Sequence, residues 1–139
     1  MGITGFVNLA MKVRDVETAA EAYRRLGATV GIPEDWEGSR RVDLWMGPVQ
    51  ITLFTRALYE DRIELPEECF LHAVYAVDDL DTALEGLDVL WGPTVVSGSF
   101  GVRRIAFLEA PGAVRIELME QLEEPPAPGV ARGSVRRET

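Results

Sequence analysis

Hydrophobic and polar residues alternate along residues 4–13, and the pattern then changes to a helical period. In the first stretch the apolar residues of one parity are Val7, Leu9, Met11 and Val13. Successive side chains of a strand point to opposite faces, so this alternation predicts a strand with one face against an apolar layer. Residues 16–26 then place apolar side chains at helical spacing, between Asp15 as a helix N-cap and Gly27 as a stop.

Three further strands are predicted in the first half of the chain, at residues 28–32, 40–46 and 49–55. The second half repeats this order. Its predicted helix covers residues 80–86, and its predicted strands cover residues 70–77, 89–96, 102–108 and 113–119. The charged stretch between the halves contains Pro66 and is interpreted as a linker, because proline and polar residues disfavour a core strand.

Three pairs of segments align between the halves in the same order. Phe6–Asp15 aligns with Phe70–Asp79 without a gap, and His72, the only histidine, falls on Asn8 because 72 − 8 is 64. The other two pairs have offsets of 63 and 65, and they are Arg40–Leu44 with Arg103–Phe107 and Gly47–Leu53 with Gly112–Leu118. Ordered matches of this kind indicate an internal duplication.

The predicted fold class is therefore α+β, built as a tandem duplication of two βαβββ modules. A chain of 139 residues is expected to form one domain. We expect that domain at residues 1–122, with module one at 3–56, the linker at 57–68 and module two at 69–121. Residues 123–139 are rich in proline, glycine and arginine and are predicted to be a flexible tail.

Composition narrows the range of partners. The net charge is −9, which argues against binding to nucleic acid and to anionic membrane surfaces. No apolar run approaches the ~20 residues that a membrane span needs. The single cysteine, Cys69, excludes an intrachain disulfide framework and is interpreted as a small core residue. The N-terminal residues show no basic segment with a cleavage site, so the expected location is the cytoplasm.

Strand parity also predicts which side chains line the inner face of the sheet. This set mixes aromatic and polar residues, as small-molecule pockets do, and it is Phe6, Asn8, Ala10, Arg41, Asp43, Trp45, Gln50, Thr52, Phe54, Phe70, His72, Val74, Arg104, Ala106, Leu108, Arg115, Glu117 and Met119. Its aromatic members either offer flat faces to a ligand, or fill the inside of the sheet or a dimer interface. Arg104 and Arg115 either neutralise Glu117 or bind a ligand that is anionic or carries a carbonyl group.

The paired modules, their Asp-capped helices and the segment Ala-Pro-Gly-Ala-Val-Arg-Ile-Glu-Leu-Met-Glu at residues 110–120 resemble the vicinal oxygen chelate superfamily. That superfamily includes glyoxalase I, extradiol dioxygenases, methylmalonyl-CoA epimerase and bleomycin-resistance proteins. The resemblance covers residues 3–121. It implies that each module bends into a cupped half-barrel and that the protein forms a homodimer.

In the metal-using members the first and last strands of each module supply the metal ligands. The resemblance carries these positions onto Asn8, Thr52, His72 and Glu117. His72 and Glu117 match the family pattern, whereas Asn8 replaces a histidine and Thr52 replaces a glutamate or glutamine. Three arrangements stay open for His72: a hydrogen bond to Glu117 without metal, a divalent ion held with Glu117, Asn8 and water, or neither.

Three functions follow as hypotheses. The main one is a protein of the glyoxalase and bleomycin-resistance type that binds a small apolar or aromatic molecule between the modules without a tightly bound metal. Its expected ligand-binding residues are Phe6, Asn8, Arg41, Trp45, Thr52, Phe54, Phe70, Arg104 and Arg115. The second is a lyase, isomerase or dioxygenase in which His72 and Glu117 are metal ligands or a catalytic acid–base pair. The third is a structural or regulatory dimer with a vestigial site.

Overall fold

The computed structural model describes residues 2–125 of the chain. Its contacts divide the chain into two compact units. Among the described residues the first unit is Val7–Ala73, and the second unit joins residues 2–6 to residues 74–125. The strands β1 (Ile3–Lys12) and β6 (Cys69–Val77) contribute residues to both units.

The first unit is a mixed sheet with one long helix. Besides parts of β1 and β6 it contains α1 (Val16–Arg25), β2 (Thr29–Val30), β3 (Glu34–Trp36), β4 (Ser39–Met46), β5 (Val49–Phe54) and the short 3-10 helix η1 (Leu58–Asp61). The strand order in this unit is β2-β4-β5-β1-β6, and β3 pairs with β4. The strand β1 runs parallel to β5, while β4 runs antiparallel to β5.

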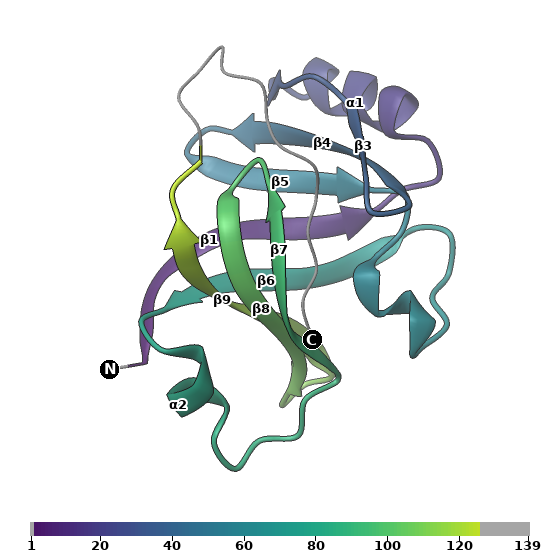
Figure 1. The fold of residues 1–139 in the computed structure, drawn as a ribbon. Coiled ribbons are helices and arrows are strands. Elements are labelled where there is room, and N and C mark those ends of the chain that lie inside the picture. Colours follow the sequence, from purple (N-terminus) through teal and green to yellow (C-terminus); the bar gives the residue numbers. More distant parts are fainter. Residues whose placement is uncertain (1, 126–139) are drawn as a thin grey trace. The chain divides into compact units, whose positions relative to one another are not determined.

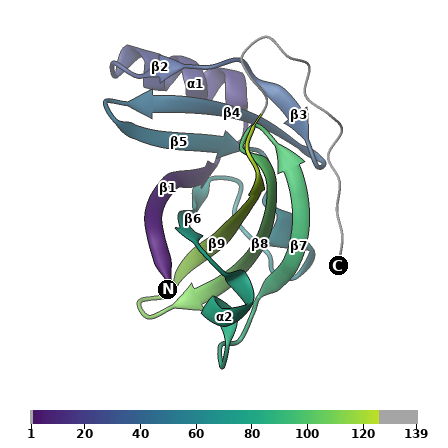
Figure 2. The same cartoon turned by 60° about the vertical axis from the view of Figure 1, so that its left-hand side comes forward.

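The helix α1 packs on one face of this sheet, along β4 and β5 (Figures 1 and 2). Asp15 caps it by accepting hydrogen bonds from the backbone of Glu17 and Thr18, and the Thr18 hydroxyl and backbone lower the pKa of the Asp15 carboxyl. The core beneath the helix is aliphatic, as strand parity predicts, and its buried residues are Val16, Ala20, Ala28, Val42, Leu44, Ile51 and Leu53.

The second unit repeats the plan. It contains the C-terminal part of β6, then α2 (Leu80–Leu84), β7 (Trp91–Gly98), β8 (Gly101–Ala110) and β9 (Val114–Glu123). The strand order here is β6-β9-β8-β7, and Figure 1 shows β9, β8 and β7 side by side. The core that packs on α2 consists of Val77, Leu80, Leu84, Ala106, Leu108 and Leu118.

This core shows that the predicted face of β8 is wrong. Ala106 and Leu108 pack with Leu80 and Leu84 of α2, on the face opposite to the predicted one. Arg104 has the same parity, and its Nη1 donates a hydrogen bond of 2.8 Å to Asp81 Oδ1 beside α2. The prediction failed because residues 105–108 are four consecutive apolar residues, so the segment has no alternation from which to read a face.

The pairing of β8 with β9 corrects the predicted alignment of the two modules. Asp43 lies opposite Thr52 in the first unit, and Phe107 lies opposite Glu117 in the second. Because 107 − 43 is 64, β4 and β8 align with the same offset of 64 as β1 and β6. The predicted offset of 63 is wrong by one residue, because it aligned the two Arg-Arg pairs of the sequence with each other. Arg40 is therefore the counterpart of Arg104, and it bonds Glu17, the counterpart of Asp81.

The fold class is confirmed: both halves are α+β units in which a strand, a helix and further strands follow one another. Two elements of the first unit, β3 and η1, are not among the predicted ones, and η1 lies in the predicted linker. The strand β9 continues to Glu123, so the folded chain extends into the first residue of the predicted tail. The remainder of that tail from residue 126 lies outside the described residues, and the domain limits remain a prediction. Among residues 2–125 no helix has the length and hydropathy of a membrane span.

Candidate functional site: a buried polar chain

A chain of hydrogen bonds crosses the inner face of the first unit, opposite α1. Asn8 Nδ2 donates to Thr52 Oγ1 at 2.9 Å, and Thr52 Oγ1 donates to Asp43 Oδ1 at 2.7 Å. The three residues come from β1, β5 and β4, which lie next to one another in the sheet. Asn8 and Thr52 are both buried, so these bonds replace the water that the two side chains would otherwise bind.

The chain continues to a buried arginine. Arg41 Nη2 donates to the same Asp43 oxygen at 2.7 Å, and Arg41 Nη1 donates to Glu34 Oε2 at 3.2 Å. The guanidinium lies over the ring of Phe54, 5.6 Å from its centre, and Trp36 packs against that ring. A buried arginine normally needs such partners, because an unpaired charge away from water is costly.

An accessible residue of this face lies near the end of β4. Trp45 follows Asp43 at the spacing of side chains on one face and keeps 38% of its surface exposed. Its partner across the sheet, Gln50, is partly buried. Three of the predicted ligand-binding residues, Asn8, Arg41 and Thr52, are thus buried and linked through Asp43 by hydrogen bonds.

His72 contacts a tyrosine from the predicted linker. The Tyr59 hydroxyl oxygen lies 2.9 Å from His72 Nδ1, and the two rings meet edge to face with their centres 5.6 Å apart. Tyr59 is completely buried and His72 is 5% exposed. The tyrosine stands on η1, which Lys12 fixes through a 2.7 Å ion pair with Glu60.

In the second unit Glu117 pairs with Arg103. Arg103 Nη1 lies 3.6 Å from Glu117 Oε2 and 3.8 Å from Met119 Sδ, and both members of the ion pair are buried. The Arg103 guanidinium also lies over the ring of Phe100. Arg103 thus takes the place that the sequence analysis gave to Arg104, while Arg115 keeps the parity of Glu117 on β9.

Two predicted aromatic ligand contacts have exposed rings. Phe6 is 49% exposed and meets Tyr75 edge to face in the second unit, and Phe70 of the first unit is 40% exposed. Since Glu117 belongs to the second unit and His72 to the first, their predicted pairing remains a prediction.

Asn8 and Thr52 do not suit a tightly bound transition metal. Asn8 and Thr52 contribute only a neutral amide and a hydroxyl, and they hydrogen-bond to each other. Such oxygens are weak ligands for transition metals, and a stable site usually has at least three good protein ligands. Within residues 2–125 no group of three His, Cys, Asp or Glu side chains is arranged to hold a metal ion.

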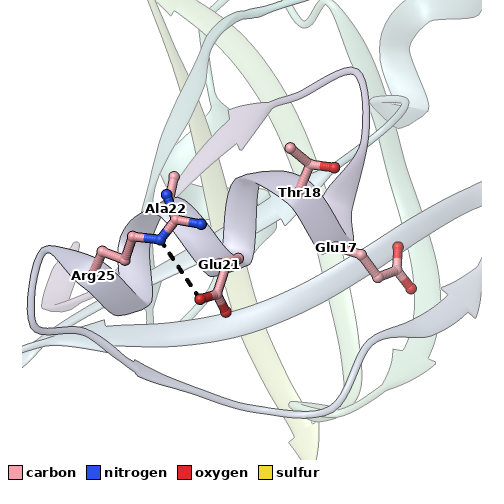
Figure 3. A pocket seen from close by; sticks show the side chains of 5 residues that line it. All are labelled: Glu17, Thr18, Glu21, Ala22 and Arg25. Carbon is pink, nitrogen blue, oxygen red and sulfur yellow. Dashed lines mark ion pairs between the residues drawn. The ribbon is translucent and has the colours of Figure 1, made fainter.

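A shallow depression on the outer surface of α1 does not have the composition of a binding site. Figure 3 shows the side chains around it, which are Glu17, Thr18, Glu21, Ala22 and Arg25. All five are exposed, and Arg25 Nε lies 3.7 Å from Glu21 Oε1. Ligand sites are enclosed and largely apolar, so this surface is interpreted as the solvated side of the helix.

Solved structures share the fold. Methylmalonyl-CoA epimerase from Mycobacterium tuberculosis is 25% identical, with a TM-score of 0.66 over 87% of this chain and 90% of that one. A variant of the Streptomyces coelicolor epimerase in complex with 2-nitronate-propionyl-CoA is 23% identical, with a TM-score of 0.62 over 87% and 99%. A variant of glyoxalase I from Zea mays is 19% identical, with a TM-score of 0.61 over 97% of this chain and 47% of that one.

Both enzymes belong to the vicinal oxygen chelate superfamily, so the chain has the fold of that superfamily. No protein-family model matches the chain. No curated protein matches its sequence.

Sequence reasoning missed Tyr59, Arg103 and Glu34 as members of these clusters. Tyr59 had a weak signal, since Ala57, Leu58 and Tyr59 form an apolar triplet inside a charged stretch, and all three are buried. With the correct face of β8, Arg103 instead of Arg104 would have been predicted beside Glu117. Glu34 had no sequence signal, because its role depends on the strand β3 that pairs it with Arg41.

We predict that Thr52→Val lowers the free energy of unfolding by about 1–3 kcal/mol, because it leaves the Asn8 amide and the Asp43 carboxylate without their shared hydroxyl. Urea denaturation measures this loss. Thr29→Val is the matched control on β2, where the side chain is exposed and the change should stay within about 0.5 kcal/mol. Equal effects of the two substitutions would contradict the role of the polar chain.

Replacing Arg103 should destabilise the protein much more than replacing the neighbouring Arg104. Arg103→Met breaks a buried ion pair and should cost about 3–5 kcal/mol. Arg104→Met breaks a surface pair with Asp81, which is 76% exposed, and should cost about 1 kcal/mol or less. Thermal and urea unfolding of both variants checks the assignment, and a larger loss for the Arg104 variant would refute the register of β8.

Proposed function

We propose that the protein is a member of the vicinal oxygen chelate superfamily that binds a small apolar or aromatic molecule and holds no tightly bound metal. The observation that supports this most directly is the hydrogen bond between Asn8 and Thr52. The resemblance carries the ligand positions of the metal-using members onto both residues, and here they hydrogen-bond to each other. The fold supports the superfamily, and its members include both enzymes and plain binding proteins.

The aromatic residues support a ligand with a flat apolar body. Trp36 and Phe54 pack together beside Arg41, and Trp45 is exposed near Asp43 on the same strand. Rings of this kind provide large contact areas, while the neighbouring polar groups give a ligand its orientation. A homodimer remains part of the proposal, and the solution mass from light scattering would check it.

The test combines ligand titration with metal analysis. Planar aromatic compounds should quench or shift the tryptophan fluorescence of the full chain, because Trp36 and Trp45 belong to the unit with the polar chain. Protein purified without chelator should contain much less than one equivalent of zinc, iron, nickel or cobalt. Binding of no planar compound, or one equivalent of tightly held metal, would refute the proposal.

A matched variant tests the two substituted positions. Asn8→His combined with Thr52→Glu replaces the neutral pair by an imidazole and a carboxylate, and it should raise cobalt or zinc affinity at least about tenfold. Asn8→Gln combined with Thr52→Ser is the control, since it changes both residues without adding a good ligand.

A second candidate is an enzyme in which His72 transfers a proton, and the buried contact between Tyr59 and His72 favours it because catalytic histidines are commonly oriented by a second group. If the protein turns over a carbonyl or enol substrate, His72→Ala and Glu117→Gln should each lower kcat by about 100-fold or more. Steady-state kinetics decides this, and unchanged turnover in both variants would exclude the pair.

A further inference from the structure

We propose that Asp43 and Trp45 of β4 form a recognition site for an organic cation, so that the molecule bound by the protein is a flat aromatic compound with a protonated amine. In this site Asp43 offers a carboxylate oxygen to the amine, and Trp45 offers an apolar face to the ring. The inference rests on the proposed function and narrows its ligand class from aromatic molecules in general to cationic ones.

The first step is the state of the Asp43 carboxylate. Its oxygen Oδ1 accepts both hydrogen bonds that tie it into the polar chain, one from Thr52 Oγ1 and one from Arg41 Nη2. Within residues 2–125 the other oxygen, Oδ2, has no such donor, and it is not one of the buried polar atoms that lack a partner. The side chain keeps 16% of its surface exposed, so Oδ2 is the oxygen that stays open to solvent.

The second step is the sign of the charge that a ligand meets. Arg41 gives only Nη2 to Asp43, because its Nη1 donates to Glu34. This guanidinium is buried and already engaged by two carboxylates, so it is not available to an anionic ligand. Arg104, which the sequence suggested for an anion, is bonded to Asp81 beside α2. The group that remains is a carboxylate oxygen, and a protonated amine is the partner that such an oxygen binds strongly.

The third step is the position of the indole. Trp45 follows Asp43 by two positions on β4, so both side chains point to the same face of the sheet. Gly31 lies beside Asp43, since its backbone nitrogen donates to the Asp43 carbonyl at 2.8 Å. A Cβ atom added to Gly31 would lie 3.8 Å from Trp45 Cζ3, so the indole reaches over the glycine to the level of Asp43. The missing side chain at residue 31 thus leaves room for the ring beside the carboxylate.

The two groups together select a ligand that is both aromatic and cationic. Trp45 keeps 38% of its surface exposed and can stack on a flat ring. A cation near its face is attracted by the indole, while the amine hydrogens bond to the carboxylate. The net charge of −9 also favours the approach of a cation over that of an anion.

Three naphthalenes of similar size test the ligand class on the wild-type full chain by isothermal titration calorimetry. At neutral pH 2-(aminomethyl)naphthalene is a cation, 2-naphthalenemethanol is neutral and 2-naphthoate is an anion. At low salt the amine should bind at least about tenfold more tightly than the alcohol, because hydrogen bonds to charged groups are the stronger ones. The anion should bind most weakly, and added salt should reduce the preference for the amine.

Two aspartate variants test the assignment to Asp43. Asp43→Asn keeps an acceptor oxygen for Thr52 and Arg41 but removes the charge, so it should abolish the preference for the amine over the alcohol. Asp35→Asn is the control. It removes an equal charge from a side chain that is 85% exposed and that pairs with Arg40, so the preference should remain.

A second pair of variants tests the contact with the indole. Trp45→Leu should weaken the binding of all three naphthalenes about fivefold, because the flat face is lost. Leu26→Ala, at the end of α1 with a side chain that is 70% exposed, is the control and should leave the three affinities unchanged.

Equal affinities for the amine and the alcohol, or tighter binding of the anion, would overturn the inference while small-molecule binding stands. Equal losses in the two aspartate variants would also overturn it, since the preference would then come from net charge, as would unchanged affinities in Trp45→Leu. If Asp43→Asn does not fold, the wild-type series and Trp45→Leu still decide the question. If neither the naphthalenes nor other planar compounds bind, the proposed function fails and this inference fails with it.

Discussion

The hydroxyl of Thr52 is the constraint on which the chemistry of the first unit depends. One hydroxyl group accepts a hydrogen bond from Asn8 and donates one to Asp43, so it links the amide to the carboxylate. Asp43 must then be an acceptor, and the same carboxylate oxygen accepts from Arg41. A buried network of this kind is stable only while each member is satisfied. Its completeness leaves no strong donor for a metal at either substituted position.

Each unit contains a buried arginine that forms an ion pair with a carboxylate on the same strand or on a neighbouring strand. In the first unit Arg41 lies between Asp43 and Glu34, and in the second Arg103 lies beside Glu117. Each guanidinium also covers a phenylalanine ring. Buried ion pairs add little net stability but are costly to break, so they limit which side chains these faces can accept. Each of these buried arginines is therefore paired with a carboxylate.

The fold could be predicted from the sequence where apolar residues recur with the period of a strand or a helix. Alternation in β1 and β4 and the helical spacing of α1 gave the elements and the buried face of the first unit, because one side of each element meets an apolar layer. The failures have physical causes. Residues 105–108 are all apolar and carry no information about a face, and the short strand β3 exists only through its pairing with β4. The contact of Tyr59 with His72 joins residues 13 positions apart through a turn that local pattern does not reveal.

An ion pair joins a strand to the helix at equivalent positions of the two modules. Arg40 holds Glu17, which lowers the pKa of that glutamate, and 64 residues later Arg104 holds Asp81. An ion pair at equivalent positions of both modules is what an internal duplication predicts. In each module it joins the helix to the strand that carries the arginine. On the opposite face the two modules differ, with Asn8 at the position of His72 and Thr52 at the position of Glu117.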